Sequence, residues 1–158
     1  MNTFFGWRMV AVAIAIDFFA VGFAFQTYPV IQLHLEEELQ LSRFVTTLTI
    51  PIFMMCSALF FPIVGRLLDQ YSVKKIIVWG GFIYSLSLMT LYLSVNYLTF
   101  IIIYGLPSAL GATLMGNLAT SKLVSSWFEK QAGRALGFAA VGVSVSYTHL
   151  RAHETRNY

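Results

Sequence analysis

Long runs of apolar residues are the feature that most restricts the possible folds of this chain. They cover residues 7–30, 44–67, 76–95 and 98–118, and a fifth run begins at Gly133 and stops at residue 144. A helix needs about 20 consecutive apolar residues to cross the hydrocarbon core of a bilayer. Because lipid offers the backbone no hydrogen bonds and no alternating strand pattern is present, these runs predict membrane-spanning helices. The predicted fold class is an all-α membrane protein.

The low charge content agrees with this prediction. Charged residues make up 11% of the chain and apolar residues 58%, whereas soluble domains carry about 25% charged residues. The net charge of +3 does not indicate a nucleic-acid partner, because the basic residues are scattered over helix ends rather than clustered on one face. Cys56 stands alone, so no disulfide forms within the chain. We expect a lipid bilayer around the chain, and no nucleic acid, metal or cofactor.

The charges of the predicted loops indicate which side of the membrane each loop faces. The loop after the first run is acidic at residues 36–38, whereas the loops after the second and fourth runs are basic. The basic residues are Arg66, Lys74 and Lys75 in one loop, and Lys122, Lys130 and Arg134 in the other. Because loops rich in lysine and arginine stay in the cytoplasm, the N-terminus and both basic loops are predicted to be cytoplasmic. The predicted location is the inner (plasma) membrane of the cell.

The last residues of the chain interrupt the fifth apolar run. From about residue 145 the sequence becomes polar, and His149 and His153 stand four residues apart. A fifth span needs about ten more apolar residues to cross the membrane core. Because the segment resembles the translation of a sequencing adaptor, we interpret residues 145–158 as a non-native tail and give its histidines no role as metal ligands. The alternative is a natural cytoplasmic or interfacial tail.

Several motifs in the predicted loops resemble those of the major facilitator superfamily. Residues 65–75 are similar to the loop between the second and third helices of that family, in which glycine, aspartate and a basic pair recur. Residues 6–8, 37–43 and 127–137 are similar to the monocarboxylate-porter and oxalate/formate-antiporter branch. Members have twelve helices in two halves, with the substrate site between them at mid-membrane. The resemblance implies that residues 1–144 form the first four helices and part of the fifth, and that the C-terminal half is missing.

The resemblance also implies a gating role for charged residues at the cytoplasmic face. In the family, the aspartate of the loop meets the positive N-terminal end of a helix in the other half, which is a favourable dipole contact. The matching residues are Gly65, Arg66, Asp69, Lys74 and Lys75, with Glu129 and Arg134 on the neighbouring loop. Gln70 and Ser72 depart from the family, which usually has arginine and glycine there. The alternative explanation of these charges is simple orientation and solvation.

Asp17 is an acidic residue near the middle of the first apolar run. A carboxylate costs about 2.5–3.5 kcal/mol to insert at the centre of a membrane helix, so such a residue faces the bundle or a wet cavity. Tyr28 shares its stripe on a 3.6-residue repeat, and both residues are candidates for binding a substrate or a coupling proton. Tyr104 and Ser108, on one face of the fourth run, are further candidates. For all four residues, packing against a neighbouring helix is the alternative.

Two pairs of small residues predict close contacts between helices. Ala112 and Gly116, and likewise Gly133 and Gly137, stand four residues apart, which is the spacing that lets helices approach one another. We interpret both pairs as packing contacts within the bundle rather than as dimer contacts.

Taken with the resemblance, these features predict a secondary active transporter that moves a small solute by alternating access. The branch resemblance implies a small organic anion such as a monocarboxylate, carried by symport or antiport with a coupling proton as a candidate partner. Two alternatives remain: a small four-helix multidrug/proton exporter, in which Asp17 replaces the usual membrane-embedded glutamate, and a membrane scaffold without transport activity. An enzyme is not expected, because residues 1–144 contain no nucleophile elbow, phosphate-binding glycine loop or metal-spaced His/Cys set.

Overall fold

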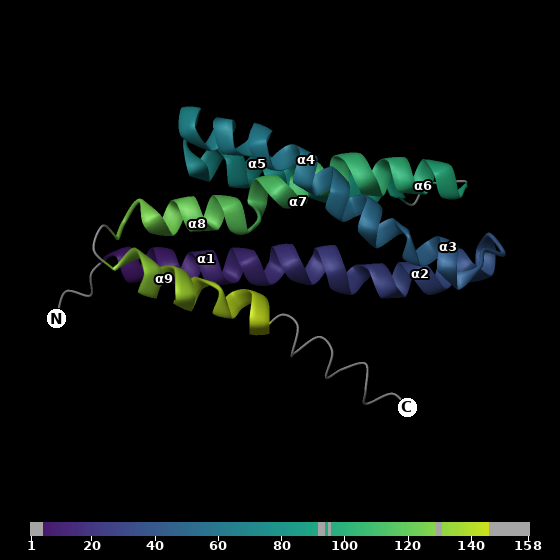
Figure 1. Ribbon diagram of the computed structural model, residues 1–158, viewed down its shortest axis with the longest axis horizontal. Coiled ribbons are helices and arrows are strands. Elements are labelled where there is room, and N and C mark those ends of the chain that lie inside the picture. Colours follow the sequence, from purple (N-terminus) through teal and green to yellow (C-terminus); the bar gives the residue numbers. More distant parts are fainter. Residues whose placement is uncertain (1–4, 92–93, 95, 129–130, 146–158) are drawn as a thin grey trace.

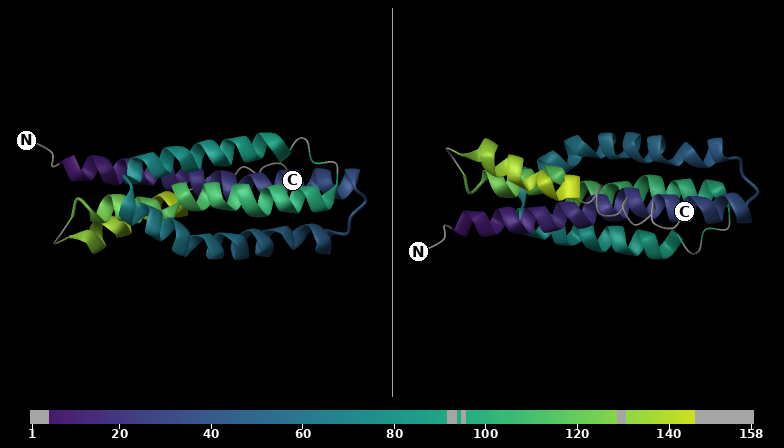
Figure 2. Two further views of the ribbon diagram at one scale, coloured as in Figure 1. Left: turned by 90° about the horizontal axis from the view of Figure 1, so that it is seen from above. Right: turned by 90° about the horizontal axis from the view of Figure 1, so that it is seen from below.

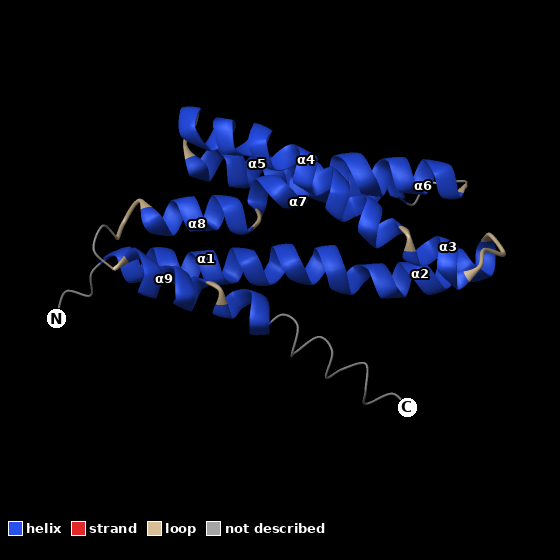
Figure 3. Ribbon diagram, in the orientation of Figure 1, coloured by secondary structure: helices blue, strands red, loops and turns tan. Residues whose placement is uncertain are grey.

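The computed structural model describes residues 5–91, 94, 96–128 and 131–145. Every regular element within these residues is a helix (Figure 3), which confirms the all-α prediction. The polar end of the chain from residue 146 onward lies outside the described residues, so the interpretation of the tail stays a prediction.

The first apolar run forms one long rod of three consecutive elements (Figure 1). They are α1 (Phe5–Val21), a π-helical turn η1 (Gly22–Gln26) and α2 (Thr27–Glu38). The helix passes Pro29 and continues eight residues beyond the predicted end at residue 30. A proline ring crowds the carbonyl four residues earlier, which here is that of Phe25. Phe25 lies in η1, and local π-helical adjustment is a known way to accommodate a proline within a membrane helix.

The fourth apolar run contains the same arrangement and is divided into four elements. They are α6 (Tyr97–Ile103), the π-helical turn η2 (Tyr104–Ser108), α7 (Ala109–Met115) and α8 (Asn117–Ser125). Pro107 lies within η2 and cannot donate to the carbonyl of Ile103. That carbonyl instead accepts a hydrogen bond from the Ser108 hydroxyl, at 3.3 Å. The helix therefore continues through Pro107.

A break at Gly116 separates α7 from α8 inside the predicted fourth span. Its backbone is extended, with φ −80° and ψ −162°. A Cβ atom at Gly116 would lie 2.7 Å from the carbonyl oxygen of Ala112, so a larger residue would require the backbone to shift. The pair Ala112 and Gly116 therefore includes a helix break that its spacing did not predict, while Ala112 packs against the core cluster that contains Tyr28 and Phe53. A Cβ at Gly133 or Gly137 would meet no atom within 4 Å in the described part of the chain, so close packing at this second pair stays a prediction.

The second, third and fifth apolar runs form the remaining helices. The second run forms α3 (Arg43–Thr47) and α4 (Thr49–Gln70), the third run forms α5 (Val73–Leu91), and the fifth begins with α9 (Ala132–Ala139). α4 and α5 pack against α7 from opposite sides (Figure 2), while α9 packs against α1 and α8. At the contact between α5 and α7, a Cβ on Gly111 would lie 2.6 Å from the backbone nitrogen of Tyr84. Glycine at this position therefore sets the spacing of the two helices.

The connections alternate between the two ends of the bundle (Figure 1). The start of α1, the turn between α4 and α5, and the end of α8 lie at one end, which we call the basic end. The connections from α2 to α3 and from α5 to α6 lie at the other end, which we call the acidic end because it carries Glu36, Glu37 and Glu38. The loop charges predicted this alternation, because they assigned successive connections to opposite sides of the membrane.

The apolar surface of the helices fits a lipid environment. Within the described residues, three helices are long and apolar enough to cross a membrane: Gly6–Phe25, Arg43–Gln70 and Tyr97–Ser125. The predicted third span is not among them, because the described part of α5 carries two lysines in its first turn and ends at Leu91, short of residue 95. Large apolar side chains point outward and form a surface that water would not favour. Examples are Phe44, Leu59 and Met89, which are 73%, 71% and 74% exposed.

Candidate functional site

A cavity of about 280 Å³ lies between the helices of the first, second and fourth apolar runs. Its polar lining residues are Ser57, Thr113 and Asn117. The apolar lining residues and glycine are Ala20, Val21, Ala24, Phe25, Phe53, Met54, Phe61, Ala112 and Gly116. No charged side chain belongs to this lining in the described chain, and its histidine, cysteine and acidic residues form no cluster that could hold a metal. The cavity therefore offers an apolar wall with a few hydrogen-bonding groups.

Asp17 is held beside α8 and does not line the cavity. The residue is 1% exposed, and the Thr120 hydroxyl oxygen lies 2.9 and 3.0 Å from its two carboxylate oxygens. The prediction that this acid faces the bundle is thus confirmed, whereas its use in binding stays a prediction. Thr120 was missed by the sequence analysis. It lies beyond the predicted end of the fourth run at residue 118, and 103 residues separate it from Asp17.

The other three predicted binding residues have their hydroxyl groups engaged in helix packing. Tyr28 is fully buried and donates a hydrogen bond to the carbonyl of Thr46. Tyr104 donates to the carbonyl of Ala24 at 2.7 Å, and Ser108 is hydrogen-bonded to Ser87 at 2.8 Å. None of the three belongs to the cavity lining. The sequence placed them on helix faces that point inward, but these faces meet neighbouring helices rather than the cavity, and their role in binding stays a prediction.

The ring of Tyr104 lies at the centre of an aromatic cluster near the acidic end. Its centroid is 5.1 Å from that of Phe53, 5.5 Å from that of Tyr28 and 5.7 Å from that of Phe100, with which it is stacked. Large aromatic rings contribute strongly to core packing. This cluster joins α2, α4, α6 and η2. Because Phe53 also lines the cavity, the cluster holds one wall of the cavity in place.

Two buried tyrosines provide a matched test of which hydroxyls stabilise the bundle. Tyr104→Phe removes the bond to Ala24 and should lower the free energy of unfolding by about 1 kcal/mol, the usual net value of a hydrogen bond. The hydroxyl of Tyr84 is buried and has no partner within the described residues. Tyr84→Phe removes an unsatisfied group, so it should leave the stability unchanged or raise it. Unfolding of the purified chain in detergent measures the stability of both variants. Equal losses of stability would contradict the stabilising role of the hydrogen bond from Tyr104 to Ala24.

A polar cluster at the acidic end joins α2 to α3. Glu36 accepts hydrogen bonds from the Thr46 hydroxyl at 2.8 Å and from the Gln32 side-chain amide at 2.9 Å. The same amide also donates to Thr46, at 3.0 Å. The bonds from Thr46 and Gln32 hold the pKa of Glu36 below its usual value. The sequence indicates only a loop charge at Glu36, because its partner Thr46 lies ten residues away across a turn.

The cluster predicts an acid-dependent loss of stability. Because the pKa of Glu36 is lower in the folded chain, its ionised form stabilises the fold above the unfolded pKa of about 4.3, and this contribution disappears as the pH falls through the folded value. Glu36→Gln should therefore lower stability at neutral pH and flatten the decline on acidification. Thermal unfolding between about pH 6 and pH 3 measures this difference. Parallel curves for the two proteins would contradict it, and Glu37→Gln on the same helix is the control.

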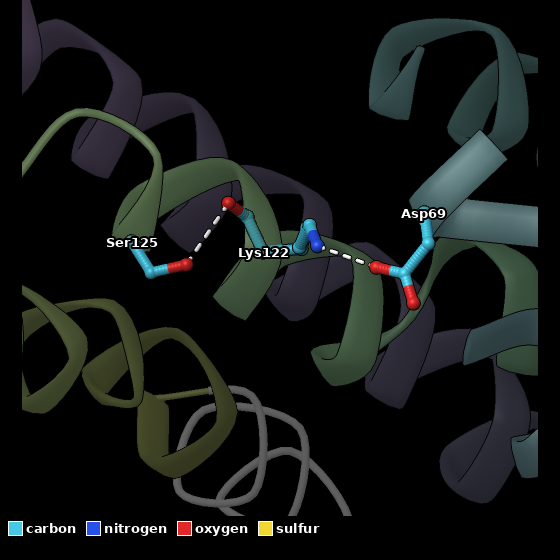
Figure 4. Close-up of polar contacts among 3 residues, drawn as sticks. All are labelled: Asp69, Lys122 and Ser125. Carbon is cyan, nitrogen blue, oxygen red and sulfur yellow. Dashed lines mark hydrogen bonds and ion pairs between the residues drawn. The ribbon is translucent and has the colours of Figure 1, made fainter. Parts of the chain in front are cut away.

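An ion pair connects two helices at the basic end (Figure 4). The Lys122 ammonium nitrogen lies 2.6 Å from a carboxylate oxygen of Asp69, and both side chains are exposed. Asp69 is near the end of α4, whereas Lys122 lies in the last turn of α8, where a positive charge is favoured by the helix dipole. The sequence indicates for Lys122 only a position in a basic loop. No local signal connects it to Asp69, because 53 residues separate them.

The other predicted gating residues are not brought together. Arg66, Lys74, Lys75 and Arg134 are exposed. A Cβ at Gly65 would meet no atom within 4 Å, so no helix of the described chain approaches it closely. Glu129 lies outside the described residues. The wider charge network across the cytoplasmic face therefore stays a prediction.

Known proteins similar to this chain are membrane transporters. The Fujikurins efflux protein of Gibberella fujikuroi is 34% identical over 84 residues, which is 53% of this chain and 18% of that protein. The MFS transporter asaE of Aspergillus flavus has the same identity over 84 residues and 19% of its length. The MFS-type transporter YcxA of Bacillus subtilis is 28% identical over 124 residues, which is 78% of this chain and 29% of that protein. No solved structure matches the chain.

The family assignment follows from a match over most of the sequence. The chain spans less than a third of the length of each of these relatives. The profile of the Major Facilitator Superfamily matches residues 4–148, and this range includes α1 to α9 and the cavity between them. The chain therefore belongs to the Major Facilitator Superfamily, whose members are transporters rather than enzymes.

Proposed function

We propose that this chain is the N-terminal part of a secondary active transporter that moves a small organic solute by alternating access. The observation that carries the proposal is the cavity between the first, second and fourth apolar runs, near the middle of the bundle. Substrate sites of such transporters lie near the bilayer midplane between two halves. On this proposal the cavity is one half of the substrate site, and a C-terminal half contributes the rest. Family membership supports this proposal over the small four-helix exporter and over a scaffold without transport activity.

The proposed substrate is a small organic anion with an apolar body, such as a monocarboxylate. The alanine, phenylalanine and methionine side chains of the lining suit the apolar body, and Ser57 and Asn117 offer hydrogen bonds to its polar end. No cation lines the cavity within the described residues. The positive charge that a carboxylate needs would therefore come from the C-terminal half.

A second candidate is export of a larger apolar metabolite. Two observations favour it: the mainly apolar lining of the cavity, and the similarity to a fungal protein named for the efflux of fujikurins. The two candidate functions differ in the direction of transport and in the charge of the substrate. Uptake of an anion depends on a cationic group, whereas export of an apolar solute does not.

Transport by the completed reading frame in proteoliposomes tests the proposal. Labelled short-chain monocarboxylates should accumulate under an inward proton gradient, and a protonophore should abolish the accumulation. Competition by unlabelled monocarboxylates, but not by neutral solutes of equal size, identifies the anion as substrate. Inhibition by neutral apolar solutes alone would favour the second candidate. Absence of flux for both classes would contradict the proposal, with empty liposomes as the baseline.

The proposed orientation predicts that the two ends of the bundle are labelled from opposite sides. Cys56 is the single cysteine of the sequence, so Cys56→Ser gives a background without thiols. In it, Lys74→Cys should react with an impermeant maleimide only from the cytoplasmic side, and Glu37→Cys only from the outside. The reason is that the basic loop stays in the cytoplasm. Labelling of both cysteines from the same side of intact cells would overturn the assigned topology.

A further inference from the structure

A buried acid lies one helical turn from the cavity on the side of the basic end. Ala20 and Val21, which line the cavity, are three and four residues after Asp17 on the same helix. Gly116 and Asn117, on the opposite wall, are four and three residues before Thr120. Residues at these spacings lie one turn apart on one face of a helix. Asp17 on α1 and Thr120 on α8 therefore each lie one turn from the cavity lining, toward the basic end.

The Thr120 hydroxyl lies within hydrogen-bonding distance of several acceptors. Its oxygen lies 2.9 and 3.0 Å from the carboxylate oxygens of Asp17, and 3.1 Å from the carbonyl oxygen of Asn117. A threonine hydroxyl donates one hydrogen bond and accepts up to two. If Asp17 is ionised, the hydroxyl donates to the carboxylate. If Asp17 is protonated, the carboxyl O–H donates to Thr120, and the Thr120 hydroxyl turns to donate to Asn117. In each state the Thr120 hydroxyl has an acceptor, and in the protonated state the carboxyl O–H of Asp17 has one as well.

No described charge balances an ionised Asp17. Of the elements that pack against α1, α7 and η1 carry no charged residue. The charged residue of α8 is Lys122, which is bound to Asp69. The charged residue of α9 is Arg134, which is exposed, as is Arg8 on α1 itself. A carboxylate held inside a membrane protein without a counter-charge is costly, and binding of a proton removes that charge.

We propose that Asp17 and Thr120 form a proton-binding pair, in which the Thr120 hydroxyl switches from the carboxylate to the Asn117 carbonyl when the carboxylate takes up a proton from water. Because Asn117 lines the cavity, the switch connects the protonation of Asp17 to the cavity wall. The role of this pair as the coupling site of a transporter rests on the proposed function, whereas the binding of a proton to Asp17 does not. A sodium ion is the competing ligand. The described residues offer it only the oxygens of Asp17, Thr120 and Asn117.

Infrared difference spectroscopy of the 158-residue chain in lipid, titrated with acid, tests the pair directly. The wild-type chain should show a protonated carboxyl C=O band that Asp17→Asn lacks. Thr120→Val keeps the acid and removes its only described hydrogen-bond partner, so the band should move to higher frequency. Thr120→Ser keeps the hydroxyl and should return the band to its wild-type position. The valine and serine variants keep the proposal testable if the asparagine variant fails to fold.

Three results would overturn the proposal. Identical acid difference spectra for wild type and Asp17→Asn would show that Asp17 does not bind a proton. An unshifted band in Thr120→Val would remove the hydroxyl switch. A band that responds to sodium at constant pH and ionic strength, with potassium as the control, would assign the site to sodium instead. The titration needs no transport, so a completed protein that moves no solute would refute the proposed function and leave this result standing.

Discussion

Replacing Gly111 with alanine is expected to lower the free energy of unfolding by at least about 3 kcal/mol, the upper end of the usual cost of overpacking a core. The added Cβ would lie 2.6 Å from the backbone nitrogen of Tyr84 and 2.8 Å from its Cα. Backbone atoms cannot rotate away as a side chain can, so α5 and α7 would have to separate. α7 packs against α4 as well as α5, and the change would therefore spread through the bundle.

The same substitution on a free surface of the same helix pair is the control. Gly81 lies on α5, and a Cβ at that position would meet no atom within 4 Å in the described chain. Gly81→Ala should therefore leave stability unchanged or raise it by up to about 1 kcal/mol, through the better helix propensity of alanine. A thiol-reactive dye that reports exposure of Cys56 on heating gives both unfolding midpoints. Equal midpoints for the two variants would contradict the contact between α5 and α7.

Three of the membrane spans could be predicted because their signal is local. A run of about 20 apolar residues is sufficient to identify a span, whatever it packs against. The ends of the helices could not be predicted in the same way. α2 continues to Glu38 through polar residues, and part of its support comes from the hydrogen bonds of Glu36 to Thr46 across the turn. Such a contact depends on how two helices pack together, and the periodicity of the sequence carries no information on that packing.

The candidate site shows the same limit. The cost of a carboxylate in lipid predicts that Asp17 is buried, but its partner Thr120 is 103 residues away. A helical stripe correctly placed Tyr28 and Tyr104 on inward faces. It could not tell whether an inward face meets a cavity or another helix, and here both hydroxyls bond to backbone carbonyls. The break at Gly116 was missed because it depends on the close approach of the Ala112 carbonyl.

Asp69→Asn is expected to remove most transport by the completed protein while leaving the bundle folded. The pair with Lys122 is exposed, and such pairs contribute only about 0–1 kcal/mol. The family resemblance implies a second partner for Asp69, the positive end of a helix in the other half, and such a contact contributes up to about 2 kcal/mol. Loss of about 2 kcal/mol from one conformation changes the ratio of two conformations about 30-fold. Uptake rates and unfolding midpoints of the same preparations measure the two effects separately.

Substitution of Lys122 distinguishes a gating role of Asp69 from the role of a simple surface charge. If Lys122 competes with the other half for the carboxylate, Lys122→Gln frees Asp69 and favours the outward-facing state, whereas Asp69→Asn disfavours it. The two substitutions should then have opposite effects on the labelling of Ser57→Cys, a cavity position, from the outside in the Cys56→Ser background. Effects of the same sign would contradict the competition. Recovery of transport on exchanging the two charges, Asp69→Lys with Lys122→Asp, would show that only the pair matters, because a lysine at residue 69 repels the positive end of a helix.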